Sequence, residues 1–211
     1  MTTLETALRR NPAIAIIRAR ASDRVAAVVE TLAANGITAV EVTLTTPGAE
    51  AAIAAVPPGL IAVGAGTVLD AAGAARAVEA GATFLITPAV LPGVLDEARR
   101  HGVPVACGAL TPTEILTAHL GGATLVKVFP ADTAGGPAYI RAVRAPLPDI
   151  PLVPTGGVTV EAAADYLRAG ARAVALGGPL IGDAADDGGD LAALARRARE
   201  LTDRLTEFAD A

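Results

Sequence analysis

One lysine stands out in this 211-residue chain. Lys127 is the only lysine, since 16 of the 17 lysines and arginines are arginines, and it lies in the apolar segment Leu-Val-Lys-Val-Phe at positions 125–129. Arginine keeps its charge and is a poor nucleophile, whereas a desolvated lysine can lose its proton and attack a carbonyl. We therefore predict that Lys127 forms a Schiff base with a carbonyl substrate. Two structural alternatives remain, namely pairing with a buried carboxylate and a chance position that reflects base composition.

Glu41 lies in another apolar segment, at positions 39–45, and suits the same chemistry. Side chains alternate along a strand, so Glu41, Thr43 and Thr45 share one face and the apolar residues between them share the other. We expect the apolar face to pack beneath helices and the polar face to line the interior of the fold. A carboxylate beside a Schiff-base amine can carry the proton that the reaction moves. The same carboxylate could instead be only the counter-ion of Lys127.

Eight short apolar segments must position these groups, and each has the length of one buried strand. The stretches between them are rich in Ala, Glu and Arg, which predicts βαβ units and a parallel sheet. We predict an α/β fold, a compact (β/α)8 barrel of eight parallel strands, formed by one domain over residues 1–211. The alternative is an open doubly wound sheet, but no Gly-x-Gly-x-x-Gly motif follows the first segment. The segments begin near Ala13, Ala39, Ile61, Thr83, Pro104, Thr124, Pro151 and Ala173.

In such a barrel Glu41 lies on the second strand and Lys127 on the sixth. These two strands stand across the barrel from each other, so both side chains can meet a substrate in the middle. Helix starts are predicted by a strong capping motif at Thr111 and Glu114 and by weaker caps at Ser22, Asp70 and Thr159. An amphipathic helix of about 20 residues is expected after the Asp- and Gly-rich positions 182–190. Glycines suited to end a helix precede five segments, at Gly36, Gly81, Gly102, Gly122 and Gly170.

Two glycine pairs follow the seventh and eighth segments. Barrel enzymes often bind phosphate with the loops after these two strands, because glycine lets backbone N–H groups approach an anion. A glycine pair by itself also suits a turn. We predict a phosphate site formed by Thr155, Gly156, Gly157, Gly177 and Gly178.

The composition argues against several classes of protein. A net charge of -5, 2% aromatic residues and no Trp disfavour a nucleic-acid partner. No apolar run of about 18 residues predicts a membrane helix, and no signal peptide is recognised, so we expect a cytoplasmic protein. One Cys and two His predict neither a disulfide framework nor a zinc site, and we expect no metal and no cofactor. We expect His101 and His119 at helix C-termini and Cys107 as a small buried residue.

Six motifs occur in one order between about residue 14 and residue 182: Glu41-Val42-Thr43-Leu44, Gly64-Ala65-Gly66-Thr67-Val68, Phe84-Leu85-Ile86-Thr87-Pro88, Thr111-Pro112-Thr113-Glu114, Lys127-Val128-Phe129-Pro130 and Pro154-Thr155-Gly156-Gly157. Together they resemble the 2-keto-3-deoxy-6-phosphogluconate (KDPG) and 4-hydroxy-2-oxoglutarate (KHG) aldolase family. The resemblance implies a small trimeric barrel that needs no metal. It implies cleavage of KDPG, or of a related 2-keto-4-hydroxy acid, to pyruvate and an aldehyde such as glyceraldehyde 3-phosphate or glyoxylate.

The same resemblance implies a role for each matching residue. Lys127 would be the Schiff-base lysine and Glu41 the general acid and base. Thr67, Pro88 and Phe129 would surround the pyruvyl part of the substrate. The two glycine pairs would hold its phosphate.

Three positions depart from the family pattern. Thr45, which we keep as a substrate-binding candidate, stands where several members have Arg. Gly178 stands where many members have a Ser that contacts phosphate, and Cys107 stands where Pro is usual. The first departure leaves open which group binds the substrate carboxylate.

Arg18 is our candidate for that carboxylate. It ends the first segment on the same face as Ile14 and Ile16, at the end of a barrel strand where catalytic groups lie. A guanidinium there can bind a carboxylate through two hydrogen bonds. The alternative is a solvated loop arginine like its neighbour Arg20.

Two other functions remain possible on such a barrel, because fold does not determine function. One is a phosphosugar isomerase or epimerase, which would use Glu41 without a covalent amine. The other is a non-catalytic sugar-phosphate binding protein, in which Lys127 and Glu41 form an internal ion pair.

Overall fold

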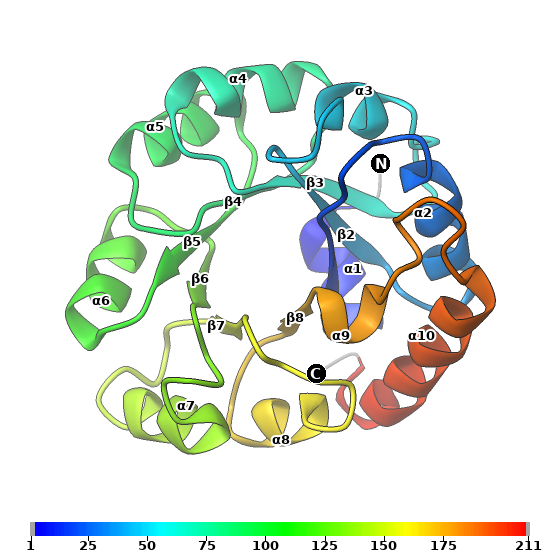
Figure 1. Cartoon of the computed structure of the whole chain (residues 1–211). Helices are drawn as coiled ribbons and strands as arrows, with labels where there is room; N and C mark the ends of the chain where they lie inside the picture. The colour runs from blue at the N-terminus through cyan, green and yellow to red at the C-terminus, as the bar shows by residue number, and fades with distance from the viewer. Residues whose placement is uncertain (1–2, 210–211) are drawn as a thin grey trace.

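The computed structural model describes residues 3–209, in which eight parallel strands alternate with helices around a barrel (Figure 1). The hydrogen-bonded strand order is β7-β6-β5-β4-β3-β2-β1-β8, and a bridge between Thr155 and Ala175 joins β7 to β8. The ring is therefore nearly closed, which confirms the (β/α)8 barrel and excludes the open sheet. The strands are β1 (Ala13–Ile17), β2 (Ala39–Thr43), β3 (Ala62–Gly66), β4 (Leu85–Ile86), β5 (Val105–Ala109), β6 (Leu125–Val128), β7 (Leu152–Pro154) and β8 (Val174–Leu176).

Helices form an outer ring around these strands, and each strand starts within two residues of its predicted position (Figure 1). Two helices lie outside this simple alternation. Helix α1 precedes the first strand, and the four-residue helix α9 directly follows β8. The helices are α1 (Leu4–Arg10), α2 (Val25–Ala34), α3 (Ala49–Ala54), α4 (Ala71–Glu79), α5 (Pro92–His101), α6 (Pro112–Leu120), α7 (Gly136–Arg144), α8 (Ala163–Arg168), α9 (Gly178–Ile181) and α10 (Leu191–Leu205).

The predicted helix ends are largely confirmed. All five glycines expected to end helices have a positive φ, between 66° and 100°. Thr111 and Glu114 form the full capping box of α6, and the Asp70 side chain accepts a hydrogen bond from the Gly73 N–H at the start of α4. The Thr159 hydroxyl accepts one from the Ala162 N–H, just before α8.

Two details of the helix prediction are wrong. Helix α2 starts three residues after Ser22, whose backbone carbonyl rather than its hydroxyl accepts a hydrogen bond from the Val25 N–H. The last α-helix, α10, has 15 residues instead of about 20. Its final turn tightens into the 3₁₀ helix η1 (Thr206–Phe208), as often happens at helix ends.

The barrel interior is divided into an apolar layer and a polar layer. At the amino ends of the strands, small residues such as Ala39 and Ala106 leave space that Phe84 and the α1 residues Leu4 and Leu8 fill. Helix α1 therefore closes this end of the barrel, and it lies behind the strands in the view of Figure 1. The polar residues of the strands are gathered at the opposite, carboxyl ends, where barrel enzymes place their active sites.

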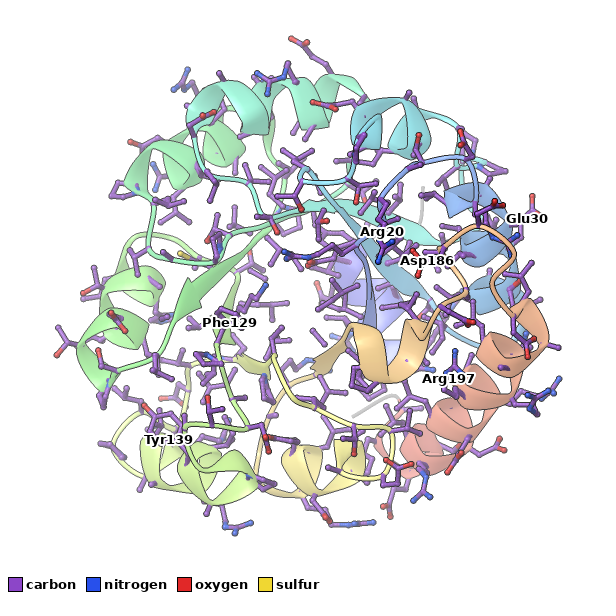
Figure 2. All side chains as sticks on the ribbon, viewed as in Figure 1. Arg20, Glu30, Phe129, Tyr139, Asp186 and Arg197 are labelled. Carbon is purple, nitrogen blue, oxygen red and sulfur yellow. The ribbon has the colours of Figure 1, made fainter. Side chains whose placement is uncertain are left out.

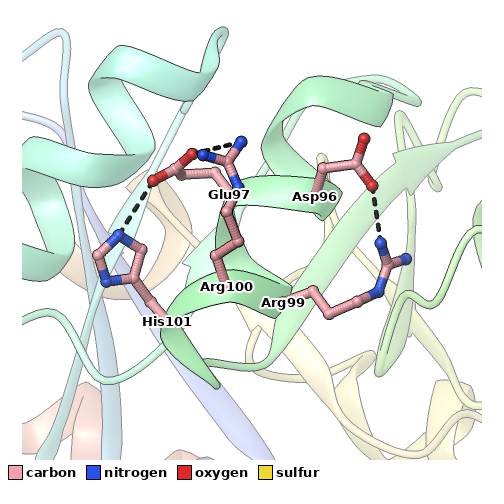
Figure 3. A network of polar contacts seen from close by, with 5 residues as sticks. All are labelled: Asp96, Glu97, Arg99, Arg100 and His101. Carbon is pink, nitrogen blue, oxygen red and sulfur yellow. Dashed lines mark hydrogen bonds and ion pairs between the residues drawn. The ribbon is translucent and has the colours of Figure 1, made fainter.

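The histidines and the cysteine take the predicted places. His101 ends α5, where its Nε2 lies 3.0 Å from Glu97 Oε1, and Arg100 pairs with the other oxygen of that carboxylate (Figure 3). His119 lies in the last turn of α6, and Cys107 is fully buried. No helix within residues 3–209 is both long and apolar enough to cross a membrane.

Candidate active site

A cavity of about 560 Å³ opens at the carboxyl ends of the strands. Among the residues named from the sequence, only Thr45 lies outside its lining. Strand β2 ends at Thr43, so the alternation that was expected to bring position 45 inward stops two residues early. Thr45 is exposed, and its hydroxyl contacts that of Thr43 at 3.1 Å. The lining includes Arg18, Glu41, Thr67, Pro88, Lys127, Phe129, Thr155, Gly156, Gly157, Gly177 and Gly178.

Lys127 and Glu41 enter the cavity from strands β6 and β2. Lys127 is 7% exposed and Glu41 is 1% exposed. The two side chains form no ion pair among those of the described residues, because the Lys127 nitrogen and the Glu41 oxygens do not approach within 4.0 Å. The Oε2 atom of Glu41 is buried and has no hydrogen-bond partner among the described residues. The carboxylate is therefore not neutralised by direct contact, and it is available to a substrate or a water molecule.

Gly66 on β3 makes room for this carboxylate. A Cβ atom at position 66 would lie 2.3 Å from Glu41 Oε1, so any side chain there would force the carboxylate to move. The glycine of the Gly64–Thr67 motif thus permits the close approach of Glu41 across the β2–β3 pair.

Burial governs the protonation of Glu41. Desolvation raises the pKa of its carboxyl, and the positive charges of Lys127 and Arg18 only partly oppose this effect. A carboxyl with a raised pKa takes up and releases a proton more readily near neutral pH than an ordinary glutamate does, which suits it to proton transfer.

Arg18 and Thr67 lie together on one side of the cavity. Arg18 Nη2 donates a hydrogen bond to Thr67 Oγ1 at 3.3 Å. Thr67 has a φ of 55°, in the left-handed region that residues other than glycine rarely adopt. Such strained backbone is often found at functional sites, and here it directs the hydroxyl toward Arg18 and the cavity.

Phe129 and Pro88 supply the apolar wall around the lysine. The Nζ atom of Lys127 lies 5.4 Å from the centroid of the Phe129 ring, within the range of a cation–π contact. Phe129 is 42% exposed at the open end of the barrel (Figure 2). A ring with one free face beside the amine can cover a bound substrate.

The glycine pairs line the cavity next to β7 and β8. Gly156 and Gly157 have φ values of 88° and 76°, so the turn after β7 needs residues without a side chain. Within residues 3–209 no hydrogen bond is found from the backbone N–H of Gly156, Gly157 or Gly178. A Cβ atom at position 178 would meet nothing within 4 Å, so this position is open to the cavity.

The sequence did not indicate several lining residues. Pro179 and Ile181 of α9, and Gly182 directly after it, line the cavity, and a helix of four residues is too short to produce a periodic pattern. Ile16 also lines the cavity, and it lies two residues before Arg18, on the same face of the strand. That shared face could have indicated its position from the sequence. Within residues 3–209, no three His, Cys, Asp or Glu side chains are arranged to hold a metal ion.

Comparison with known proteins gives a consistent result. Residues 4–196 match the model of the family described as KDPG and KHG aldolase. A 2-dehydro-3-deoxy-phosphogluconate aldolase of Pseudomonas aeruginosa is 39% identical over 181 residues, which cover 84% of this chain and 82% of that protein.

Solved structures agree with this match. A KDPG aldolase from Legionella pneumophila, with pyruvate captured as a covalent carbinolamine intermediate, is 25% identical with a TM-score of 0.77, and 97% of each chain is covered. A cage designed by fusing symmetric oligomeric domains contains a chain that is 33% identical, with a TM-score of 0.85. The match covers 93% of this chain and 73% of that one.

Proposed function

The chain belongs to the KDPG and KHG aldolase family, and from this premise we propose that Lys127 is the residue that forms its Schiff base. The enzyme is a class I aldolase that cleaves KDPG or a related 2-keto-4-hydroxy acid to pyruvate and an aldehyde. The observation that supports Lys127 most strongly is its position. The only lysine of the chain is buried in the active-site cavity, close to a carboxylate with which it makes no direct ion pair.

The reaction begins when the unprotonated amine of Lys127 adds to the 2-keto carbon and water leaves, which gives an iminium. Glu41, directly or through a water molecule, removes the proton of the 4-hydroxyl. The C3–C4 bond breaks, its electron pair moves into the iminium, and the aldehyde leaves an enamine of pyruvate on Lys127. Glu41 then returns a proton to C3, and water hydrolyses the new iminium to release pyruvate.

Trapping with pyruvate and borohydride tests this mechanism. Borohydride reduces an iminium to a stable amine, so the intact protein should gain the mass of one reduced pyruvate. A phosphosugar isomerase on the same barrel, or a sugar-phosphate binding protein, has no iminium to reduce and would keep its original mass.

We further propose that Arg18 and Thr67 bind the carboxylate of the keto acid. Arg18 is paired with no carboxylate within the described chain, and both side chains line the cavity that holds Lys127. A guanidinium and a hydroxyl 3.3 Å apart can donate to the two oxygens of one carboxylate.

Arg18→Ala should therefore lower kcat/KM for the keto acid by about 10- to 100-fold, the usual effect of losing a hydrogen bond to a charged group. Arg20→Ala is the matched control, because Arg20 lies outside the cavity lining, and it should change little. Adding Thr45→Arg to Arg18→Ala should restore part of the loss. Unchanged kcat/KM in Arg18→Ala would mean that the carboxylate is bound elsewhere.

We propose that the glycine pairs, with Thr155, bind the phosphate of the substrate. The backbone N–H groups of Gly156, Gly157 and Gly178, which have no partner in the described part of the chain, border the same part of the cavity, and such groups bind anions well. The absence of the Ser that many family members have at position 178 leaves this binding to the backbone.

Inorganic phosphate should accordingly compete with a phosphorylated substrate, and Gly178→Leu should raise KM without unfolding the protein, because position 178 has free space. Gly178→Ser, which adds a hydroxyl donor, should lower KM. Steady-state kinetics on phosphorylated and dephosphorylated substrates measure both effects. Equal kcat/KM of the wild-type enzyme on the two substrates would refute the phosphate site.

We also propose that the enzyme is a homotrimer of single-domain chains, located in the cytoplasm and acting on a small molecule without nucleic acid. The family resemblance implies the trimer. The designed cage supports it, because a chain of this fold was used there among symmetric oligomeric domains.

A further inference from the structure

We propose that Arg197 is a positioning residue, which holds helix α9 so that its glycine end can bind the phosphate of the substrate. The inference rests on the phosphate site proposed above. Arg197 itself does not line the cavity, whereas Gly178, Pro179 and Ile181 of α9 do.

The two hydrogen bonds of Arg197 end on the backbone of α9. Its Nε donates to the Leu180 carbonyl at 2.7 Å, and its Nη2 donates to the Ile181 carbonyl at 2.9 Å. A helix of four residues has few internal hydrogen bonds, and within residues 3–209 the Leu180 carbonyl accepts none from a backbone N–H. The Ile181 carbonyl also accepts one from the Ala184 N–H at 3.2 Å. The planar guanidinium binds both carbonyls at once, in one orientation.

Besides these hydrogen bonds, the charge of Arg197 attracts the Asp190 carboxylate at the start of its own helix, α10, and helps to lower the pKa of that carboxyl. Arg197 extends from α10, is half-buried, and forms no ion pair within residues 3–209. Figure 2 shows it between α10 and α9. Helix α9 ends at Gly182, which has a φ of 58°. The absence of a side chain at this position leaves room for the guanidinium, since a Cβ atom there would lie 2.6 Å from Arg197 Nη2. The guanidinium thus lies directly behind the part of the chain that borders the cavity.

Arg24 provides a matched control. It also donates two hydrogen bonds to backbone carbonyls of the following loop, at Ala184 (3.0 Å) and Gly189 (2.8 Å). Neither of these residues lines the active-site cavity. Arg24 and Arg197 therefore hold the same loop region in the same manner, but only Arg197 holds the part that borders the proposed phosphate site.

The test compares Arg197→Gln, Arg197→Lys and Arg24→Gln with the wild type. For each, kcat/KM is measured on a phosphorylated keto acid and on its dephosphorylated form, and the rate of trapping with pyruvate and borohydride is measured separately. Both Arg197 variants should lose about tenfold in the preference for the phosphorylated substrate, through KM. Their rate of pyruvate trapping should stay normal, and Arg24→Gln should keep the full preference.

The outcomes separate this inference from the site on which it rests. A wild-type enzyme without preference for the phosphorylated substrate refutes the phosphate site itself. A preference that is large in the wild type and unchanged in both Arg197 variants overturns the inference. A full preference in Arg197→Lys also overturns the inference, because a positive charge alone would then be sufficient. An equal loss in the rate of pyruvate trapping overturns it as well, because the effect of the variants would then not be confined to the phosphate end of the substrate.

Discussion

Lys127→Arg is expected to fold and to lose all measurable cleavage. The substitution keeps the positive charge beside Phe129 and Glu41, but a guanidinium cannot form the Schiff base. A lysine that served only as an ion-pair partner would tolerate this change in part. Turnover assays and the thermal melting of the variant measure the two properties separately.

Trapping with pyruvate and borohydride gives the decisive second measurement on this variant. The wild type should gain one reduced pyruvate, and Lys127→Arg should gain none. Arg20→Lys serves as the control, because it exchanges the same two residue types outside the cavity lining and leaves Lys127 in place. Appreciable cleavage by a folded Lys127→Arg enzyme would rule out the covalent mechanism.

Glu41→Gln is expected to slow cleavage by about 10²- to 10⁴-fold, the usual contribution of a general acid or base. The amide keeps the shape of the side chain in the space that Gly66 leaves, but it cannot accept the proton of the 4-hydroxyl. Because the first condensation depends on Lys127, the pyruvate adduct should still be trapped. A near-normal rate would show that Glu41 is only a counter-ion.

The pH dependence gives a second test of Glu41. Burial raises the pKa of its carboxyl above the ordinary value of 4.5, so the carboxylate is lost at a higher pH than in an ordinary glutamate. As the pH falls, kcat/KM should therefore decline through that raised pKa, and Glu41→Gln should lack this acid limb. Arg18 lowers the pKa of Glu41, so Arg18→Ala should move the limb to still higher pH.

The same shift predicts an effect on stability. A carboxyl whose pKa is raised by folding stabilises the native state below the unfolded pKa, and this contribution is lost as the pH rises through the folded pKa. Burial of the Glu41 carboxyl therefore destabilises the protein at neutral pH, where the same group in the unfolded chain is ionised. Glu41→Gln should melt at a higher temperature than the wild type at pH 7, and the difference should shrink as the pH is lowered toward the pKa of an ordinary glutamate.

The strands and the positions of Glu41 and Lys127 were predictable from sequence for a physical reason. Strands of a parallel barrel are buried on both faces, so they read as short apolar runs, and a charged residue within such a run is conspicuous. Alternation along β2 and β6 then places Glu41 and Lys127 on the inner face, as the cavity lining confirms.

What the sequence did not indicate depends on contacts between distant segments. The spacing of Leu4 and Leu8 in α1 is too weak a pattern to predict that they are buried. Their burial is explained by the small side chains of Ala39 and Ala106, which leave space in the barrel interior. Helix α9 is too short for a periodic signal, and its backbone carbonyls accept hydrogen bonds from Arg197 on another helix. The exposed position of Thr45 follows from where β2 ends, and strand ends are the least regular part of any such pattern.

The burial of a lone lysine also determines how this protein responds to chemical labelling. Apart from the α-amino group of the chain, the only primary amine is Lys127, and it is 7% exposed inside the cavity. Any reagent that modifies an ε-amine therefore reads out the occupancy of this one cavity, and a substrate that covers Lys127 should protect the protein from it. The fraction of molecules modified, read from the intact mass, then counts active sites without reference to turnover.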